Sequence, residues 1–140
     1  MTSLSPAAKG TAILHPASLP SVDRGSGAST VQLVTQELGS TGFLNGITTF
    51  APGASIAHHT HNCAESVVII EGDAIVDIDG VETHLVLFDT TFVPGNISHR
   101  FRNASDTAVM RILWTYASVD ATRTLIATGD TGRVDGEQAG

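Results

Sequence analysis

The feature that most constrains the fold is a succession of short β-type segments between Val31 and Tyr116. These segments are rich in β-branched and aromatic residues, and turn signals such as Asp79-Gly80 separate them. The expected strands lie within residues 31–38, 42–50, 55–61, 65–72, 73–80, 81–87, 90–94, 98–103 and 108–117. No helical period exceeds a turn or two, apart from a short terminal helix expected at residues 118–126. This pattern predicts a closed or sandwiched all-β barrel.

The chain of 140 residues has the size of one domain. Residues 1–28 are rich in Ser, Pro, Gly and Ala and are expected to form an irregular arm. Residues 129–140 are polar and glycine-rich and are expected to form a loose tail. The predicted barrel domain therefore occupies residues 29–128.

The composition argues against several classes of partner. The formal net charge is −7 and the few basic residues are scattered, so nucleic acid is not an expected partner. No apolar stretch approaches the roughly 20 residues that span a bilayer, so no membrane partner is expected. The single cysteine, Cys63, allows no intrachain disulfide, and the absence of a signal-like start favours the cytoplasm.

A second constraint lies in the stretch from Gly53 to Gly72. His59 and His61 are separated by one residue, so on a strand their side chains project from the same face. Glu65 follows a short polar break that can turn the chain, and His99 offers a further imidazole. Three imidazoles and a carboxylate suit one divalent transition metal ion per chain. Fe²⁺ is the first expectation, with Mn²⁺, Ni²⁺, Zn²⁺ and Co²⁺ as alternatives.

These residues resemble the two sequence motifs of the cupin superfamily. The first motif matches at every position that defines it, which are Gly53, His59, His61, Glu65 and Gly72. The second matches at Pro94, His99 and Asn103. Two glycines of the second motif are replaced, by Phe88 and by Asn96. Asn tolerates a left-handed backbone, whereas Phe does not, so the turn before Phe92 is expected to differ from that of the family.

The resemblance implies a small single-domain cupin. Its fold would be a double-stranded β-helix, or jelly-roll barrel, with extra N-terminal strands. His59, His61, Glu65 and His99 would be the metal ligands inside the barrel. Small cupins resemble one another in forming dimers by exchange of N-terminal strands, so a homodimer that uses residues within 1–40 is expected.

A substrate pocket is expected on the inward faces of the barrel strands. Its candidate wall residues are Phe50, Val67, Ile69, Phe92, Phe101, Ile112, Trp114 and Tyr116, with Asn45 and Thr49 as candidates to orient a substrate. So few inward charges would leave the metal as the one strong polar feature of an apolar pocket. Cys63 is either a thiol beside the ligands or a small buried hydrophobe.

The resemblance implies a metal-dependent enzyme that acts on a small organic molecule. Dioxygenase chemistry on a substrate chelated to the metal is the first expectation, with Glu65 as a base. A redox-neutral isomerase, lyase or cyclase that uses the metal as a Lewis acid is the second. A non-catalytic module that binds a small ligand through the metal is the third.

Overall fold

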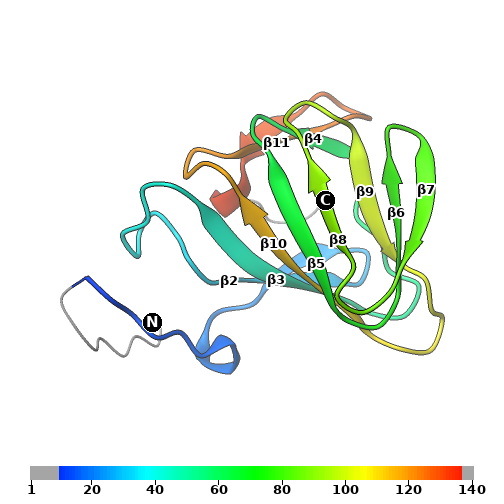
Figure 1. Ribbon diagram of the computed structural model, residues 1–140, viewed down its shortest axis with the longest axis horizontal. Coiled ribbons are helices and arrows are strands. Elements are labelled where there is room, and N and C mark those ends of the chain that lie inside the picture. Colours follow the sequence, from blue (N-terminus) through cyan, green and yellow to red (C-terminus); the bar gives the residue numbers. More distant parts are fainter. Residues whose placement is uncertain (1–9, 137–140) are drawn as a thin grey trace.

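The computed structural model describes residues 10–136 and shows two antiparallel sheets that face each other as a jelly-roll barrel (Figure 1). In order across the first sheet, the strands are β1 (Val22–Gly25), β2 (Ala28–Gln32), β3 (Leu44–Phe50), β10 (Met110–Tyr116), β5 (Glu65–Glu71) and β8 (Thr90–Val93). The second contains β12 (Thr131–Arg133), β11 (Thr122–Leu125), β4 (His59–His61), β9 (His99–Asn103), β6 (Ala74–Ile78) and β7 (Val81–Leu85). Two 3₁₀ turns, Pro16–Ser18 and Val134–Gly136, complete the described elements. The all-β prediction is confirmed.

Local structure differs from the expectation at both ends of the barrel. The helix expected at residues 118–126 is wrong, because Thr122–Leu125 forms β11 between β4 and β12. The expected arm contains β1, which pairs with β2, and the first expected strand ends at Gln32. The secondary structure of these segments depends on pairing with strands that are distant in sequence. Short-range sequence patterns do not contain that information. The described helical turns include none long and apolar enough to cross a bilayer.

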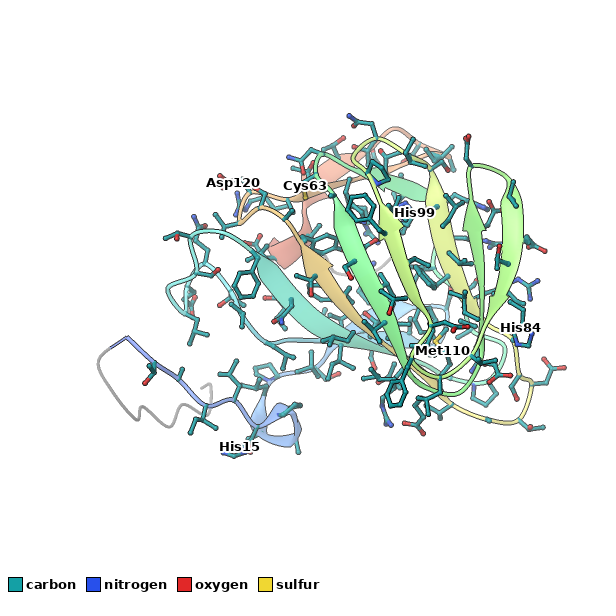
Figure 2. The ribbon with its side chains drawn as sticks, in the orientation of Figure 1. His15, Cys63, His84, His99, Met110 and Asp120 are labelled. Atoms are coloured by element: carbon teal, nitrogen blue, oxygen red, sulfur yellow. The ribbon has the colours of Figure 1, made fainter. Side chains whose placement is uncertain are left out.

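Two long strands of the first sheet, β3 and β10, show how the core is built. β3 and β10 pair along their whole lengths, and in each the residues alternate between buried and half-buried. Phe50 and Met110 are partners in this register and are fully buried, together with Ile69. Met110 lies toward the lower end of the barrel in Figure 2, and His99 lies higher. Large apolar side chains therefore fill one end of the barrel, and the polar site lies nearer the other.

The turn that precedes β8 contains a residue in the left-handed conformation. Phe88 has φ 71°, the left-handed conformation that is costly for a phenylalanine. Its backbone N–H donates to Ile69 at 2.7 Å, and the Asp89 carboxylate accepts from the Val86 N–H at 2.9 Å. These bonds offset a strain of about 1–2 kcal/mol. Asn96 has φ 67° and donates its N–H to the His61 carbonyl, which confirms that asparagine takes the left-handed position.

Gly46 makes room for the ring of Trp114, which lies opposite it in the register of β3 and β10. A Cβ at Gly46 would lie 2.4 Å from Trp114 Cζ2 and 2.6 Å from the Val31 carbonyl oxygen. Backbone on one side and a buried ring on the other leave little room for adjustment.

We expect Gly46→Ala to lower the free energy of unfolding by about 1–3 kcal/mol, the usual cost of overpacking. It should also shift the fluorescence of Trp114, the single tryptophan of the chain. Urea denaturation followed by fluorescence measures both effects. The matched control is Gly42→Ala, because a Cβ there meets no atom within 4 Å. Equal stability of the two variants would show that the contact with Trp114 is not tight.

Candidate metal centre

Neighbouring strands β4 and β9 of the second sheet bring three histidines together. His59 and His61 project inward from β4, and His99 of β9 is the register partner of His59. All three side chains are buried, with at most 3% of each residue exposed. The ring centroids lie 4.5–5.1 Å apart. Side chains from positions about 40 residues apart in the chain therefore converge inside the barrel.

Each imidazole is held by a hydrogen bond from Nδ1 to a backbone carbonyl oxygen. His59 donates to Ala57 at 2.7 Å, His61 to Thr122 at 2.9 Å and His99 to Ile97 at 2.8 Å. A carbonyl oxygen only accepts, so Nδ1 carries the proton in each ring. The Nε2 atoms are therefore the nitrogens available to ligate a metal, in rings whose orientation is fixed.

Glu65, at the start of β5, brings the one carboxylate to this group. Its Oε1 lies 2.9 Å from His99 Nε2 and 3.8 Å from His61 Nε2. Burial lowers the pKa of His99, but the hydrogen bond and charge of Glu65 outweigh burial and raise it. His99 then donates from both ring nitrogens.

The other two imidazoles favour the neutral form. Burial lowers the pKa of His59 well below its ordinary value, and the charges of His99 and His61 lower it further. Burial also lowers the pKa of His61, against the opposing charge of Glu65. Arg123 adds a smaller lowering at both. Neutral imidazoles whose Nε2 lone pairs carry no proton are the form that binds a metal.

The donor set fits a divalent transition metal. Ligand nitrogens of the three histidines all lie within 4.8 Å of one another. Nitrogens bound tetrahedrally at about 2.1 Å to one ion lie about 3.4 Å apart, so the three rings would move closer by up to about 1.4 Å to bind it. His61 Nε2 is buried and has no hydrogen-bond partner among the described residues, which is the state a metal ligand leaves when its ion is removed. His59, His61 and His99 could therefore hold a metal.

A cavity inside the barrel opens onto these groups. Besides two arginines, its described lining residues are Thr48, Ile56, His59, Glu65, Phe101, Ile112, Trp114 and Tyr116. Four of the expected wall residues, Phe101, Ile112, Trp114 and Tyr116, thus line it. Trp114 and Tyr116 stack at 5.0 Å between centroids, and Tyr116 lies 4.6 Å from the ring of His61.

The remaining expected wall residues lie elsewhere. Phe50, Val67 and Ile69 face the interior but are buried in the apolar core and do not line this cavity. Phe92 is 71% exposed on the outer face.

Asn45 and Thr49 share a face of β3, but it is the outer face. There Asn45 Oδ1 accepts from the Val34 N–H at 2.9 Å, and Thr49 accepts from Arg111 at 3.1 Å. Both side chains hold neighbouring chain segments, and Thr48 is the residue of β3 that faces the cavity.

Cys63 and His58 are not among the described residues that line the cavity. Cys63, in the loop after β4, packs against the core, and burial raises the pKa of its thiol. It therefore behaves as a small hydrophobe. His58 turns to the other face of its segment and lies 3.3 Å from Asp77. His15 and His84 lie far from His99 in Figure 2.

Two charged residues of the cavity were not among the sequence candidates. Arg24 of β1 and Arg123 of β11 are 4% and 8% exposed, and both line the cavity. The expectation that the metal would be its one strong polar feature is wrong. Arg24 lay in the expected arm and Arg123 in the expected helix, so no strand alternation marked either as inward. Alternation within the short segment TRTL was the one signal available for Arg123.

A jelly-roll barrel with three convergent buried histidines defines a class of small β-barrel proteins with a candidate metal centre. Residues 46–116 match the family described as Cupin domain, which is half of the chain. The chain therefore belongs to the cupin family.

The chain is also similar to individual proteins. It is 33% identical over 88 residues to polyketide synthase CurC of Streptomyces cyaneus. That match covers 62% of this chain and 56% of the relative, so the chain spans little more than half of the relative's length.

Solved structures share the fold at lower identity. An RmlC-like cupin from Shewanella frigidimarina has a TM-score of 0.67 at 21% identity, over 82% of this chain and 93% of that one. The polyketide cyclase RemF from Streptomyces resistomycificus has a TM-score of 0.69 at 16% identity, over 87% and 84%. At these identities the likeness shows the fold alone.

We expect His61→Gln to weaken Zn²⁺ binding at least about 100-fold, because one of three ligands is lost. Competition with a chromophoric chelator measures the affinity. His84→Gln is the matched control, because His84 is an exposed histidine paired with Asp73. Equal affinities of the two variants would show that His61 is not a ligand.

Proposed function

We propose that this protein is a metal-dependent enzyme that removes a proton from a carbon next to a carbonyl of a small organic substrate, in a redox-neutral reaction of the cyclase or isomerase type. The observation that carries the proposal is one buried carboxylate beside three convergent imidazoles. A divalent metal held by His59, His61 and His99 would polarise the substrate carbonyl as a Lewis acid. Fe²⁺, Mn²⁺, Ni²⁺, Zn²⁺ and Co²⁺ all suit these donors.

Glu65 is the base in this proposal. Among the described residues that line the cavity it is the one carboxylate, and it is 5% exposed. It lies within hydrogen-bond distance of His99 Nε2, so it can either ligate the metal or accept a proton beside it. Trp114, Tyr116 and Phe101 provide apolar walls that exclude water from a carbanion-like transition state.

The relatives favour the redox-neutral reaction. RemF is a polyketide cyclase, and CurC is named a polyketide synthase. A polyketide carries carbonyls on alternate carbons, and ring closure begins with proton removal between them. A polyketide-like β-dicarbonyl compound is therefore the proposed substrate class.

Dioxygenase chemistry on the same substrate class is the second candidate. Three imidazole ligands and a carboxylate also suit Fe²⁺, and an aromatic-lined cavity suits apolar oxygen. The two reactions differ in whether oxygen is consumed.

The test uses acetylacetone as a β-dicarbonyl probe with metal-loaded protein. Under anaerobic conditions in D₂O we expect deuterium to enter the probe faster than in buffer, as measured by NMR. We expect Glu65→Gln to slow this exchange about 10²–10⁴-fold while keeping its metal, because general-base catalysis contributes that factor. Glu71→Gln is the control, since Glu71 is an exposed carboxylate on the same strand.

Three other outcomes separate the alternatives. Consumption of the probe with oxygen uptake, and no anaerobic exchange, would favour the dioxygenase. Full activity of Glu65→Gln would remove Glu65 as the base. Binding of the probe without either reaction would favour a non-catalytic binding module.

We also propose that the protein is a homodimer joined through the outer face of the first sheet. Four aliphatic side chains, Val31, Ile47, Leu113 and Val68, form a row across β2, β3, β10 and β5, because each is the register partner of the next. All four are half-buried on the face that points away from the core. A continuous apolar row on one face is typical of a surface that a partner covers.

We expect Leu113→Glu to convert the dimer to a monomer, because a carboxylate in the middle of the row would be buried unpaired. Size-exclusion chromatography with light scattering measures the mass. Val86→Glu is the control, since Val86 is 48% exposed and lies outside the row. An unchanged dimer in Leu113→Glu would place the interface elsewhere.

A further inference from the structure

The cavity beside the candidate metal centre is too small for the proposed substrate when it is closed. Its free volume is about 20 Å³, close to that of one water molecule. A β-dicarbonyl compound that reaches Glu65 and the histidines therefore needs one wall of the cavity to move. The position of each wall residue in its sheet indicates which wall that is.

Strand β1 is the part of the wall with the fewest backbone ties. The described lining residues lie on β1, β3, β4, β5, β9, β10 and β11, and in the loop at Ile56. That loop is tied to β9 by the bridge between Ser55 and Arg102. Each of these strands except β1 lies between two others, whereas β1 is at the edge of its sheet and pairs with β2 alone among the described strands. The segment that opens at the lowest cost is therefore β1, which carries Arg24.

Strand β1 also lies between the cavity and a larger space. A groove of about 360 Å³ has six apolar residues in its lining, which are Leu14, Leu19, Pro20, Val22, Leu33 and Leu38. Val22 lines this groove, and Arg24 of the same strand lines the cavity. Small-molecule sites are typically about 300–1,000 Å³ and mostly apolar, so the groove has the size and character of such a site.

The turn after β1 provides a hinge. Gly25, Ser26 and Gly27 have φ of 78°, 53° and 84°. The register of β1 and β2 shifts between Asp23 and Gly25, so the pairing is irregular next to the turn. The far end of the turn is anchored, because the Gly27 carbonyl accepts from the Ala51 N–H at 2.9 Å. This geometry lets β1 swing at the turn while β2 keeps its place.

The side chain of Arg24 holds β1 in the closed position. Arg24 is 4% exposed, and its Nη1 donates to Thr30 Oγ1 at 3.3 Å. Thr30 Oγ1 lies 2.9 Å from Thr48 Oγ1, which accepts from Trp114 Nε1 at 2.9 Å. Arg24 therefore belongs to the same part of the wall as Trp114, and displacement of β1 gives solutes access to the indole ring.

We propose that β1 is a movable wall, and that its displacement joins the metal cavity to the groove in one substrate-binding pocket. The reactive carbonyl then lies beside Glu65 and the histidines, and an apolar part of the substrate lies along the leucines of the groove. The role of the movable wall in turnover rests on the proposed function, but its opening requires neither metal nor substrate. The proposed substrate class is thereby narrowed to β-dicarbonyl compounds that carry an apolar chain or ring.

The test locks β1 to β2 with a disulfide and measures quenching of Trp114 fluorescence by acrylamide. Asp23 and Ser29 are register partners, and the Cα separation of about 4.5–5.5 Å in such pairs suits a disulfide. Asp23→Cys and Ser29→Cys are made together with Cys63→Ala, which removes the competing thiol. Trp114 is the single tryptophan of the chain, so the signal reports the cavity wall alone.

We expect the quenching constant of the metal-free protein to be at least about threefold larger with the disulfide reduced than with it oxidised. Acrylamide is larger than the closed cavity, so it reaches Trp114 from the cavity only when β1 opens. The chain with Asp23→Cys and Cys63→Ala alone is the matched control, and its quenching should not respond to the reductant. Equal quenching in the oxidised and reduced forms would overturn the proposal.

Arg24→Ala tests the movable wall without a disulfide. We expect it to raise the quenching constant at least about twofold, because truncation of a buried side chain leaves the wall incomplete. Arg100→Ala is the matched control, because it truncates a half-buried arginine outside the cavity. Unchanged quenching in Arg24→Ala would also overturn the proposal.

The groove is tested with benzoylacetone, a β-dicarbonyl compound that carries a phenyl ring, against acetylacetone. We expect Leu38→Gln to weaken benzoylacetone binding to the metal-loaded protein about three- to tenfold and to leave acetylacetone binding within about twofold, as measured by calorimetry. Leu87→Gln is the control, since Leu87 is 50% exposed and lies outside the groove. An equal effect on both probes would remove the groove from the pocket.

The movable wall and the proposed function fail in different ways. Quenching that depends on the disulfide, without deuterium exchange into acetylacetone, would refute the proposed function alone. Exchange at the same rate in the oxidised and reduced forms, with equal quenching, would refute the movable wall alone.

Discussion

Three hydrogen bonds from imidazole Nδ1 atoms to backbone carbonyl oxygens underlie the whole arrangement. The carbonyls belong to Ala57, Thr122 and Ile97, which lie in three segments far apart in the chain. Their positions are fixed by the pairing of β4 with β9 and β11. The barrel fold therefore sets the tautomer and direction of each ring before any metal arrives. Preorganised ligands of this kind lose little conformational entropy on binding.

The pairing of β4 with β11 also brings an arginine next to the candidate metal centre. β11 supplies the carbonyl that orients His61 and, one residue on, the guanidinium of Arg123.

Much of the fold was predictable from the sequence because local sequence patterns mark the middle strands. β3, β5, β6 and β10 alternate or are continuously apolar between clear turns, and the spacing of His59, His61 and Glu65 marked the candidate centre. The ends of the barrel were not predictable in this way. β1 and β11 acquire their structure from partners distant in the chain, so the inward direction of Arg24 and Arg123 was hidden.

For a related reason, the sequence did not show which face of β3 points into the barrel. Its sequence LNGITTF places apolar residues on both faces, so period-two alternation does not say which face is inward. The structure buries the face that carries Leu44, Gly46 and Phe50, and the ring of Trp114 fills the space beside Gly46. The left-handed Phe88 was likewise missed, since backbone bonds to Ile69 outweigh its intrinsic preference.

The central claim is that three imidazoles of one chain share one metal ion. The X-ray absorption spectrum of the protein loaded with one equivalent of Zn²⁺ or Co²⁺ tests it most directly. We predict about three nitrogen ligands at about 2.0–2.1 Å, with the outer-shell scattering that imidazole rings produce. A spectrum that shows oxygen ligands alone, or fewer than two imidazoles, would contradict the account.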